Sequence, residues 1–315
     1  MLAFVIRRLI GAIAVLIGVS FIVFLIFIVV PGGDPATRLA GKNANDQLIA
    51  NIKHNWGFDR PFYTQYGIMM KKAFTGKLVS YTNQTNVTTQ IKEGLAATFS
   101  LSIGAAIIWM AFGILVGVIS AVKAGRWSDR VITIVALIGI SMPVFWLGIL
   151  TRYFFAEKHT WFPDGEYVGL TQNPFQWFWH LLLPWLVLAV LFIGVYGRVL
   201  RGNMLDAINE DYVRTARAKG LDPRRVLIKH VLRNSLIPIV TLFGLDFAAV
   251  LGGGAILTET VFDLHGVGQY AAQSIGAFDL PPIMGVTLFG AFFIVLFSAI
   301  VDFIYAFLDP RIRPA

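Results

Sequence analysis

The sequence contains no cysteine and few charged residues. Without cysteine, the chain cannot form disulfides, iron–sulfur clusters, thiolate zinc sites, catalytic thiols or cysteine-linked lipid anchors. Charged residues make up 14% of the 315 residues, whereas soluble domains contain about 25%. Hydrophobic residues make up 57%, and the mean hydropathy is +0.70. These values exclude a soluble enzyme, a disordered chain and a disulfide-stabilised secreted domain, and they indicate an integral membrane protein.

Sequence motifs of several enzyme classes are also missing. No Gly-x-x-x-x-Gly-Lys-Ser/Thr is present: Gly76-Lys77 is followed by Leu78, and Lys71 stands where the first glycine should be. The chain therefore has no P-loop for ATP, and energy must come from a partner. His-Glu-x-x-His and Gly-x-Ser-x-Gly are absent, and the five histidines lack metal-ligand spacing. We therefore predict no catalytic residues and no metal site in this chain.

Six apolar segments are long enough to cross a bilayer. A transmembrane helix needs about 20 apolar residues, because its backbone amides must find their partners within the segment. The first segment is too long for a secretory signal and lacks a cleavage site, so we expect it to remain as an anchor. The predicted spans are residues 9–30, 98–122, 131–150, 181–197, 235–256 and 283–301. The sequence thus predicts an all-α integral membrane protein with six transmembrane helices.

The positions of lysine and arginine predict that both termini are cytoplasmic. With the N-terminus inside, the inner segments carry 16 of these residues, and the two short outer loops carry two, Arg152 and Lys158. The other eight lie in loop 31–97, which is long enough to escape the positive-inside rule. A nucleic-acid patch is the competing interpretation of the net charge of +8. We reject it and predict no nucleic-acid partner, because the charges flank apolar spans.

Local patterns predict further structure in the outer loops. Apolar residues recur at helical spacing from Asn45 to Gly57 and again after Asn86. We expect two short amphipathic helices there, on the membrane surface. Aromatic residues in the next outer loop are typical of an interfacial belt, with ligand stacking as the alternative. These aromatic residues are Trp161, Tyr167, Trp177 and Trp179.

Glycines and prolines within the spans indicate close packing or a transport path. Gly113 and Gly117 are four residues apart in the second span, which predicts close helix packing. Pro143, Pro184 and Pro238 lie within or near spans, where proline frees a backbone carbonyl. Such carbonyls are tolerated where neighbours or a water-lined cavity satisfy them. Pro143 and Pro238 are therefore candidates for the path, with simple packing kinks as the alternative.

The acidic residue Asp246 lies within the fifth span. An ionised carboxylate at this depth costs several kcal/mol unless it faces water or a partner. Two roles are open: it lines a path and attracts a peptide amino terminus or a cation, or it pairs with another helix. An ion-coupled secondary transporter with Asp246 as carrier residue is an alternative function.

The inner loop 198–234 contains the start and stop signals of two helices. Gly220 supplies a left-handed stop, Asp222 an N-cap and Pro223 a first helical residue. We therefore expect a short helix over residues 209–219 and a second that runs into the fifth span.

The short helix carries small and cationic residues on different faces. Val213, Ala216 and Gly220 share one face, on which a partner protein's surface could approach the backbone. The flanking cations could pair with carboxylates of that partner or, alternatively, with anionic lipid. These cations are Arg214, Arg217 and Lys219.

This segment resembles the EAA loop, the coupling helix of permease subunits in ATP-binding-cassette importers of the dipeptide, oligopeptide and nickel branch. Arg214-Thr215-Ala216 stand in place of the usual Glu-Ala-Ala, and His265-Gly266-Val267-Gly268 in place of Pro-Gly-Leu-Gly. The residues that match the coupling helix are Glu210, Asp211, Tyr212, Val213, Arg214, Thr215, Ala216, Arg217, Lys219 and Gly220. Collinear matching stretches are residues 30–35, 57–61, 141–148, 233–238, 259–262 and 309–313.

The resemblance implies a type I importer permease fold in a bacterial or archaeal cell membrane. It implies half of a path for di- or oligopeptides, with nickel or another small solute as alternative substrates. The implied partners are a homologous second permease, two cytoplasmic ATPases that bind ATP and magnesium, and an extracytoplasmic substrate-binding protein. No cofactor is expected in this chain. We expect an N-terminal part over residues 1–97, a permease core over 98–308 and a cytoplasmic tail over 309–315.

Overall fold

The computed structural model describes residues 2–29, 34–40 and 45–308. These residues form helices joined by turns, with one isolated bridge between Val79 and Asn86 and no strand. The predicted all-α class is confirmed. Residues 30–33 of the first matching stretch, and the tail 309–315, lie outside the described residues.

The membrane-crossing helices agree with the predicted spans. Five helices in the described part of the chain are long and apolar enough to cross a membrane, and one bent pair makes a sixth span if it is counted as one. The five are Ile6–Val29, Val87–Val122, Pro174–Ile208, Ile237–Gly254 and Leu280–Val301, and the pair is Trp127–Ser141 with Val144–Lys158.

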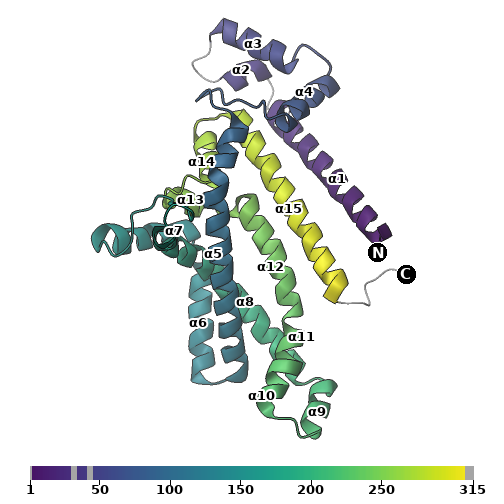
Figure 1. Cartoon of the computed structure of the whole chain (residues 1–315), viewed down its shortest axis with the longest axis vertical. Helices are drawn as coiled ribbons and strands as arrows, with labels where there is room; N and C mark the ends of the chain where they lie inside the picture. Colours follow the sequence, from purple (N-terminus) through teal and green to yellow (C-terminus); the bar gives the residue numbers. More distant parts are fainter. Residues whose placement is uncertain (1, 30–33, 41–44, 309–315) are drawn as a thin grey trace. The chain divides into compact units, whose positions relative to one another are not determined.

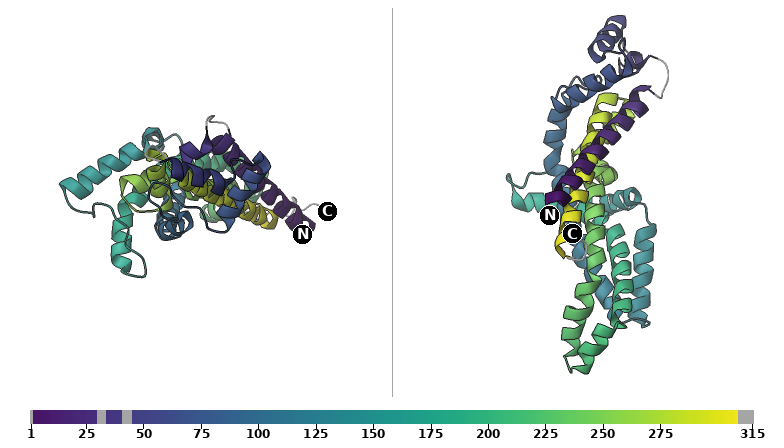
Figure 2. Two further views of the ribbon diagram at one scale, coloured as in Figure 1. Left: turned by 90° about the horizontal axis from the view of Figure 1, so that it is seen from above. Right: turned by 90° about the vertical axis from the view of Figure 1, so that its right-hand side faces the viewer.

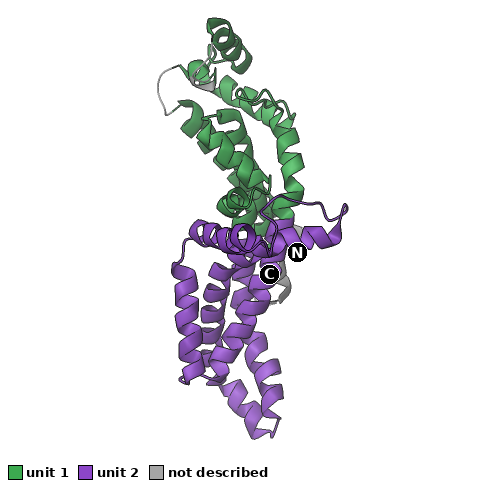
Figure 3. Ribbon diagram, turned by 90° about the vertical axis from the view of Figure 1, so that its left-hand side faces the viewer, with its two compact units in different colours: residues 1–99, 248–315 green, residues 100–247 purple. Residues whose placement is uncertain are grey.

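The chain divides into two compact units, which are coloured separately in Figure 3. Unit 1 comprises Met1–Phe99 and Ala248–Ala315, and unit 2 comprises Ser100–Phe247. The second boundary falls in the fifth span, and residues 248–315 pack with residues 1–99. These units reflect packing alone, so the expected division after residues 97 and 308 stays a prediction.

Unit 1 is built on two long helices that run side by side, α1 (Leu2–Phe24) and α15 (Leu280–Leu308), as Figures 1 and 2 show. Phe24, Trp56 and Met69 are buried in its apolar core. The other elements are η1 (Leu25–Val29), α2 (Pro35–Ala40), α3 (Asp46–Trp56), α4 (Phe62–Phe74), the start of α5 (Val87–Val122), η4 (Val250–Gly254), α13 (Ile256–Val261) and α14 (Val267–Gly276).

One of the two expected surface helices is separate, and the other is not. The Asn45 side chain accepts a hydrogen bond from the Leu48 amide at the start of α3, and Gly57 ends this helix with a φ of 65°. The Asn86 side chain likewise accepts from the Thr89 amide at 3.1 Å, but the helix that begins there is α5, which continues to Val122. No proline interrupts α5, so the second expected helix is the first turns of a membrane span.

Unit 2 consists of the rest of α5 and the elements up to residue 247. A Cβ atom at Gly113 would lie 2.7 Å from Tyr196 Cβ, and one at Gly117 would lie 2.8 Å from Leu200 Cβ. These glycines therefore let α5 and α8 approach closely. The elements are α6 (Trp127–Ser141), α7 (Val144–Thr151), η2 (Arg152–Lys158), α8 (Pro174–Ile208), α9 (Asp211–Ala218), α10 (Pro223–Arg225), η3 (Val226–Leu232), α11 (Arg233–Ser235) and α12 (Ile237–Ala249).

The third expected span, residues 131–150, is broken rather than straight. Helix α6 ends at Ser141, α7 begins at Val144, and the two helices are bent by 98°. Met142 has extended backbone angles, as steric conflict with a following proline favours. Pro143 also lacks the amide that would continue the helix. Pro143 is therefore the physical reason that this span bends.

Candidate functional site

The loop between α8 and α12 contains the short helix α9. Its eight residues are fewer than the expected 209–219, because Glu210 is the N-cap and Lys219 the C-cap. The Glu210 carbonyl accepts hydrogen bonds from the amides of Val213 and Arg214 at 3.0 and 3.2 Å. Val213 is 0% exposed and Ala216 is 4% exposed. α9 packs against η3, so Val213 and Ala216 of the small-residue face are buried within the chain, whereas Gly220 remains exposed.

The exposed face of α9 is polar and mainly cationic. Arg214 and Asp211 form an exposed ion pair at 3.5 Å, which contributes little to stability because solvent screens it. Such a surface suits a partner with carboxylates. The exposed residues of α9 and its C-cap are Asp211, Tyr212, Arg214, Thr215, Arg217, Ala218 and Lys219.

A glycine follows α9, and an aspartate and a proline begin α10. Gly220 has a φ of 71°, in the left-handed region, and an added Cβ would meet no described atom within 4 Å. The Asp222 carboxylate accepts from the amides of Arg224 and Arg225 at 3.0 and 3.1 Å, and Pro223 is the first residue of α10. These helix signals are confirmed. The following segment is helical up to Ser235, and α12 begins at Ile237, so the expected second helix has one break.

This break lies just before Pro238, the second residue of α12. Proline has no amide to donate to the preceding turn. Its side chain is exposed, as is that of Pro143.

A partly buried ion pair, which sequence reasoning missed, links three spans next to this loop. Asp129 on α6 accepts two hydrogen bonds from the Arg201 guanidinium on α8, at 2.9 and 2.8 Å. It also accepts from the Ser120 hydroxyl on α5 and from the Gly125 amide. The Asp129 side chain is 5% exposed. An aspartate in the first turn of a span was the available signal, but only the fold shows that Arg201 lies beside it.

Asp246 on α12 is half-buried and has a partner on another helix. The Tyr196 hydroxyl on α8 donates a hydrogen bond to its carboxylate at 2.9 Å. Tyr196 is fully buried. In the same unit, the Trp109 ring lies near the rings of Phe192 and Phe243. The interhelical partner that the sequence left open is therefore present within unit 2.

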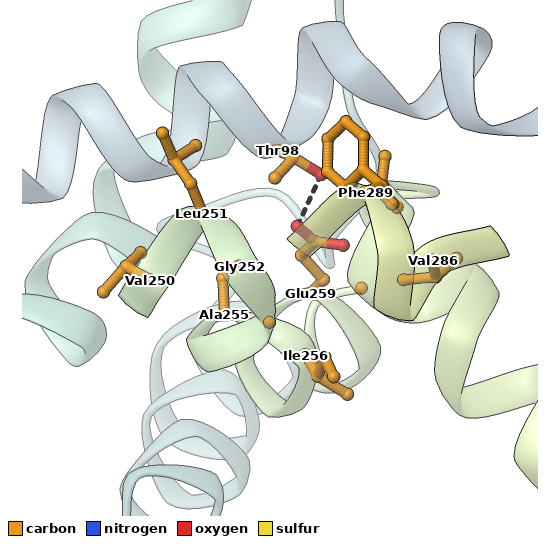
Figure 4. Close-up of a pocket in the computed structure, with 12 residues that line it drawn as sticks. Thr98, Val250, Leu251, Gly252, Ala255, Ile256, Glu259, Val286 and Phe289 are labelled. Carbon is orange, nitrogen blue, oxygen red and sulfur yellow. Dashed lines mark hydrogen bonds between the residues drawn. The ribbon is translucent and has the colours of Figure 1, made fainter. Parts of the chain in front are cut away.

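A second buried carboxylate, Glu259 on α13, lines a cavity of about 10 Å³ in unit 1 (Figure 4), about the size that one water needs. It accepts from the Thr98 hydroxyl at 2.7 Å and from the Gln269 amide at 2.9 Å. Burial raises the pKa of the Glu259 carboxyl, and these hydrogen bonds partly oppose the rise.

Two glycines make room for this carboxylate. A Cβ at Gly266 would lie 2.3 Å from Glu259 Oε2, and one at Gly268 would lie 2.9 Å from it. Sequence reasoning noted residues 259–262 only as a matching stretch. It missed the site because Thr98 is 161 residues away in the chain.

Among the residues that the structure describes, no three His, Asp or Glu side chains are grouped so that they could hold a metal ion.

Comparison with known proteins covers both parts of the chain. Residues 113–314 match the family described as binding-protein-dependent transport system inner membrane component, and residues 1–102 match the N-terminal family of the same system.

Several relatives match over nearly their whole length. The dipeptide transport system permease protein DppB of Alkalihalophilus pseudofirmus is 36% identical, covering 99% of this chain and 100% of the relative. A probable peptide ABC transporter permease of Sinorhizobium fredii is 37% identical, covering 98% and 99%. A probable D,D-dipeptide transport system permease of Escherichia coli is 36% identical, covering 96% and 95%.

A solved structure supports the fold. The inward-facing MetNI methionine ABC transporter has a chain that is similar with a TM-score of 0.50 at 18% identity, covering 71% of this chain and 96% of that one. The fold is therefore that of an ABC importer permease. With its several membrane-crossing helices, the chain is a multi-pass cell-membrane protein and belongs to the family of binding-protein-dependent transport system inner membrane components.

Proposed function

We propose that this chain is a permease subunit of a peptide importer and forms half of the translocation path. The observation that carries this proposal is its similarity, over nearly the whole chain, to permeases named for dipeptide or peptide transport. Nickel or another small solute is the alternative substrate. The chain itself is not an enzyme, and two cytoplasmic ATPase subunits bind ATP and magnesium.

In this proposal, α9 is the coupling helix. Its buried side, formed by Val213 and Ala216, fixes the helix on η3, while its exposed cations enter a groove of the ATPase. The N- and C-termini then lie in the cytoplasm, on the same side as α9. The coupling residues are those that match the EAA loop, from Glu210 to Gly220.

Movement of α9 reaches the membrane spans through α8. Arg201 lies near the end of α8 and binds Asp129 on α6, which also accepts from Ser120 on α5. A displacement of α8 is therefore shared by three spans. ATP-driven closure of the ATPases would in this way switch the permease between inward- and outward-facing states. Substrate can bias these states only by its different affinity for each.

The path itself lies between this chain and a homologous second permease. Asp246 lines it and binds the amino terminus of a peptide, and the Tyr196 hydroxyl holds its carboxylate in place. Pro143 and Pro238, which are exposed and lie at helix breaks, line the same path in this proposal. An extracytoplasmic binding protein delivers substrate to the outer loops.

Replacing Gly220 with tryptophan tests the coupling role. The side chain would stand beside α9 in a left-handed position that disfavours it. We expect the complex to reach the membrane but to lose its ATPase subunits, which co-purification measures.

Gly125→Trp is the matched control, because Gly125 also has a positive φ, 78°, and open space around it. It should keep the ATPases. Normal ATPase recovery with Gly220→Trp would refute the coupling role.

A further inference from the structure

Unit 1 contains an apolar groove that the transport mechanism does not use. It is bounded by α1, α4, the first turns of α5 and α15, and its volume is about 610 Å³. Figure 1 shows α4 beside the ends of these helices. Its apolar lining includes Ile13, Ile17, Phe74, Ile91, Leu288 and Phe292.

The setting of the groove favours a hydrocarbon chain as its occupant. Three of its walls, α1, α5 and α15, are themselves candidate membrane spans, so lipid can reach the groove directly. A helix of a partner subunit is the alternative occupant, and it would need an acidic residue opposite the lysine at the polar end of the groove.

The polar end of the groove lies at the start of α5. Thr88 and Lys92, one helical turn apart, both line the groove. A Cβ at Gly76 would lie 3.4 Å from Thr88 Oγ1, so the turn that carries Lys77 is close by. Lys77 and Lys92 are exposed. The one acidic neighbour on α5, Glu93, accepts from Gln90 at 3.1 Å.

Neither Lys77 nor Lys92 forms an ion pair with another described residue. An apolar groove lined at one end by an unpaired lysine, Lys92, has the polarity of a phospholipid with a negative head group.

We propose that this groove binds one acyl chain of an anionic phospholipid, with the phosphate beside Lys92 and Thr88. The hydrocarbon tail gains no selectivity, because bulk lipid is as apolar as the groove. Lys92 supplies the selectivity. One lysine near an anionic lipid surface changes affinity by about fivefold.

The test titrates phosphatidylglycerol or phosphatidylcholine, with identical acyl chains, into the delipidated complex and counts bound lipids by native mass spectrometry. Wild type should prefer phosphatidylglycerol by about fivefold or more. Lys92→Glu should abolish the preference. Lys123→Glu, which changes the residue just after the opposite end of α5, should retain it. An equal preference for phosphatidylglycerol in Lys92→Glu and Lys123→Glu would overturn the proposal.

A second pair of variants tests the groove itself. Ile17→Trp should fill it and remove both lipids, whereas Val15→Trp, on α1 but outside the lining, should not. Where Ile17→Trp does not purify, Leu288→Trp fills the groove from α15. Lipid binding that is unchanged by these groove variants would overturn the proposal. Loss of the second permease without loss of lipid would also overturn it, because that result would identify a helix of the partner as the occupant.

Discussion

At the scale of single residues, the carboxylates of this chain differ in what stabilises them. Asp129 has a guanidinium, Asp246 a phenol, and Glu259 a hydroxyl and backbone amides. Only Asp246 has a single described partner and is half-buried. Its remaining hydrogen-bonding capacity is what a substrate's ammonium group would use.

Replacing Asp246 with asparagine should therefore impair transport without unfolding the permease. The amide can still accept from Tyr196 but has no charge for a substrate's ammonium group. A hydrogen bond to a charged group contributes about 1.5–3 kcal/mol, so we expect an increase of about ten- to hundredfold in the KM for uptake. Tyr196→Phe is the comparison, because it keeps the charge. Degradation of Asp246→Asn, or unchanged uptake, would contradict a path role.

At the scale of elements, tertiary contacts decided what the sequence pattern left open. Periodicity correctly grouped Val213 with Ala216, but it could not show that η3 covers this face. The same limit applies to Asp129, since its partner Arg201 lies 72 residues away. Capping signals are local, so Asn45, Gly57 and Asp222 could be interpreted correctly. The bend at Pro143 also had a local cause, although apolar composition alone favoured one straight span.

Removing the charge of Asp129 should destabilise the bundle of α5, α6 and α8. Asparagine cannot neutralise Arg201. Because the Arg201 side chain is 32% exposed, we expect a cost of about 1.5–3 kcal/mol, typical of hydrogen bonds to charged groups. A thermal unfolding assay on the detergent-solubilised complex should show a clearly lowered Tm. Asp211→Asn makes the same chemical change in the exposed pair with Arg214, and it should leave Tm nearly unchanged. Equal effects of the two variants would show that the Asp129 pair does not link the helices.

At the scale of the whole molecule, the fold class, the spans and the family could be predicted from the sequence. Composition and long apolar segments determine where the membrane helices are, and collinear motifs identify the family. The grouping of residues 248–315 with the N-terminal segment could not be predicted. It depends on the packing of α1 and α14 against α15, which joins residues that are distant in the chain.

An importer driven by partner ATPases should keep working when the proton gradient is abolished. We expect substrate uptake by cells to persist in the presence of a proton uncoupler if cellular ATP is held constant. An ion-coupled secondary transporter, which the family match does not favour, would stop. Uptake that collapses under these conditions would exclude the proposed energy source, and inhibition by ATP depletion alone is the complementary measurement.

The surroundings of Glu259 have one more consequence. Its described donors are a hydroxyl and the amides of Gln269 and Gly268, rather than a mobile cationic side chain. Dissolved ions weaken attractions between exposed charges, but they hardly reach a fully enclosed group held by fixed dipoles. We therefore expect ionic strength to affect the contact between α5, α13 and α14 much less than it affects the exposed ion pairs of the chain.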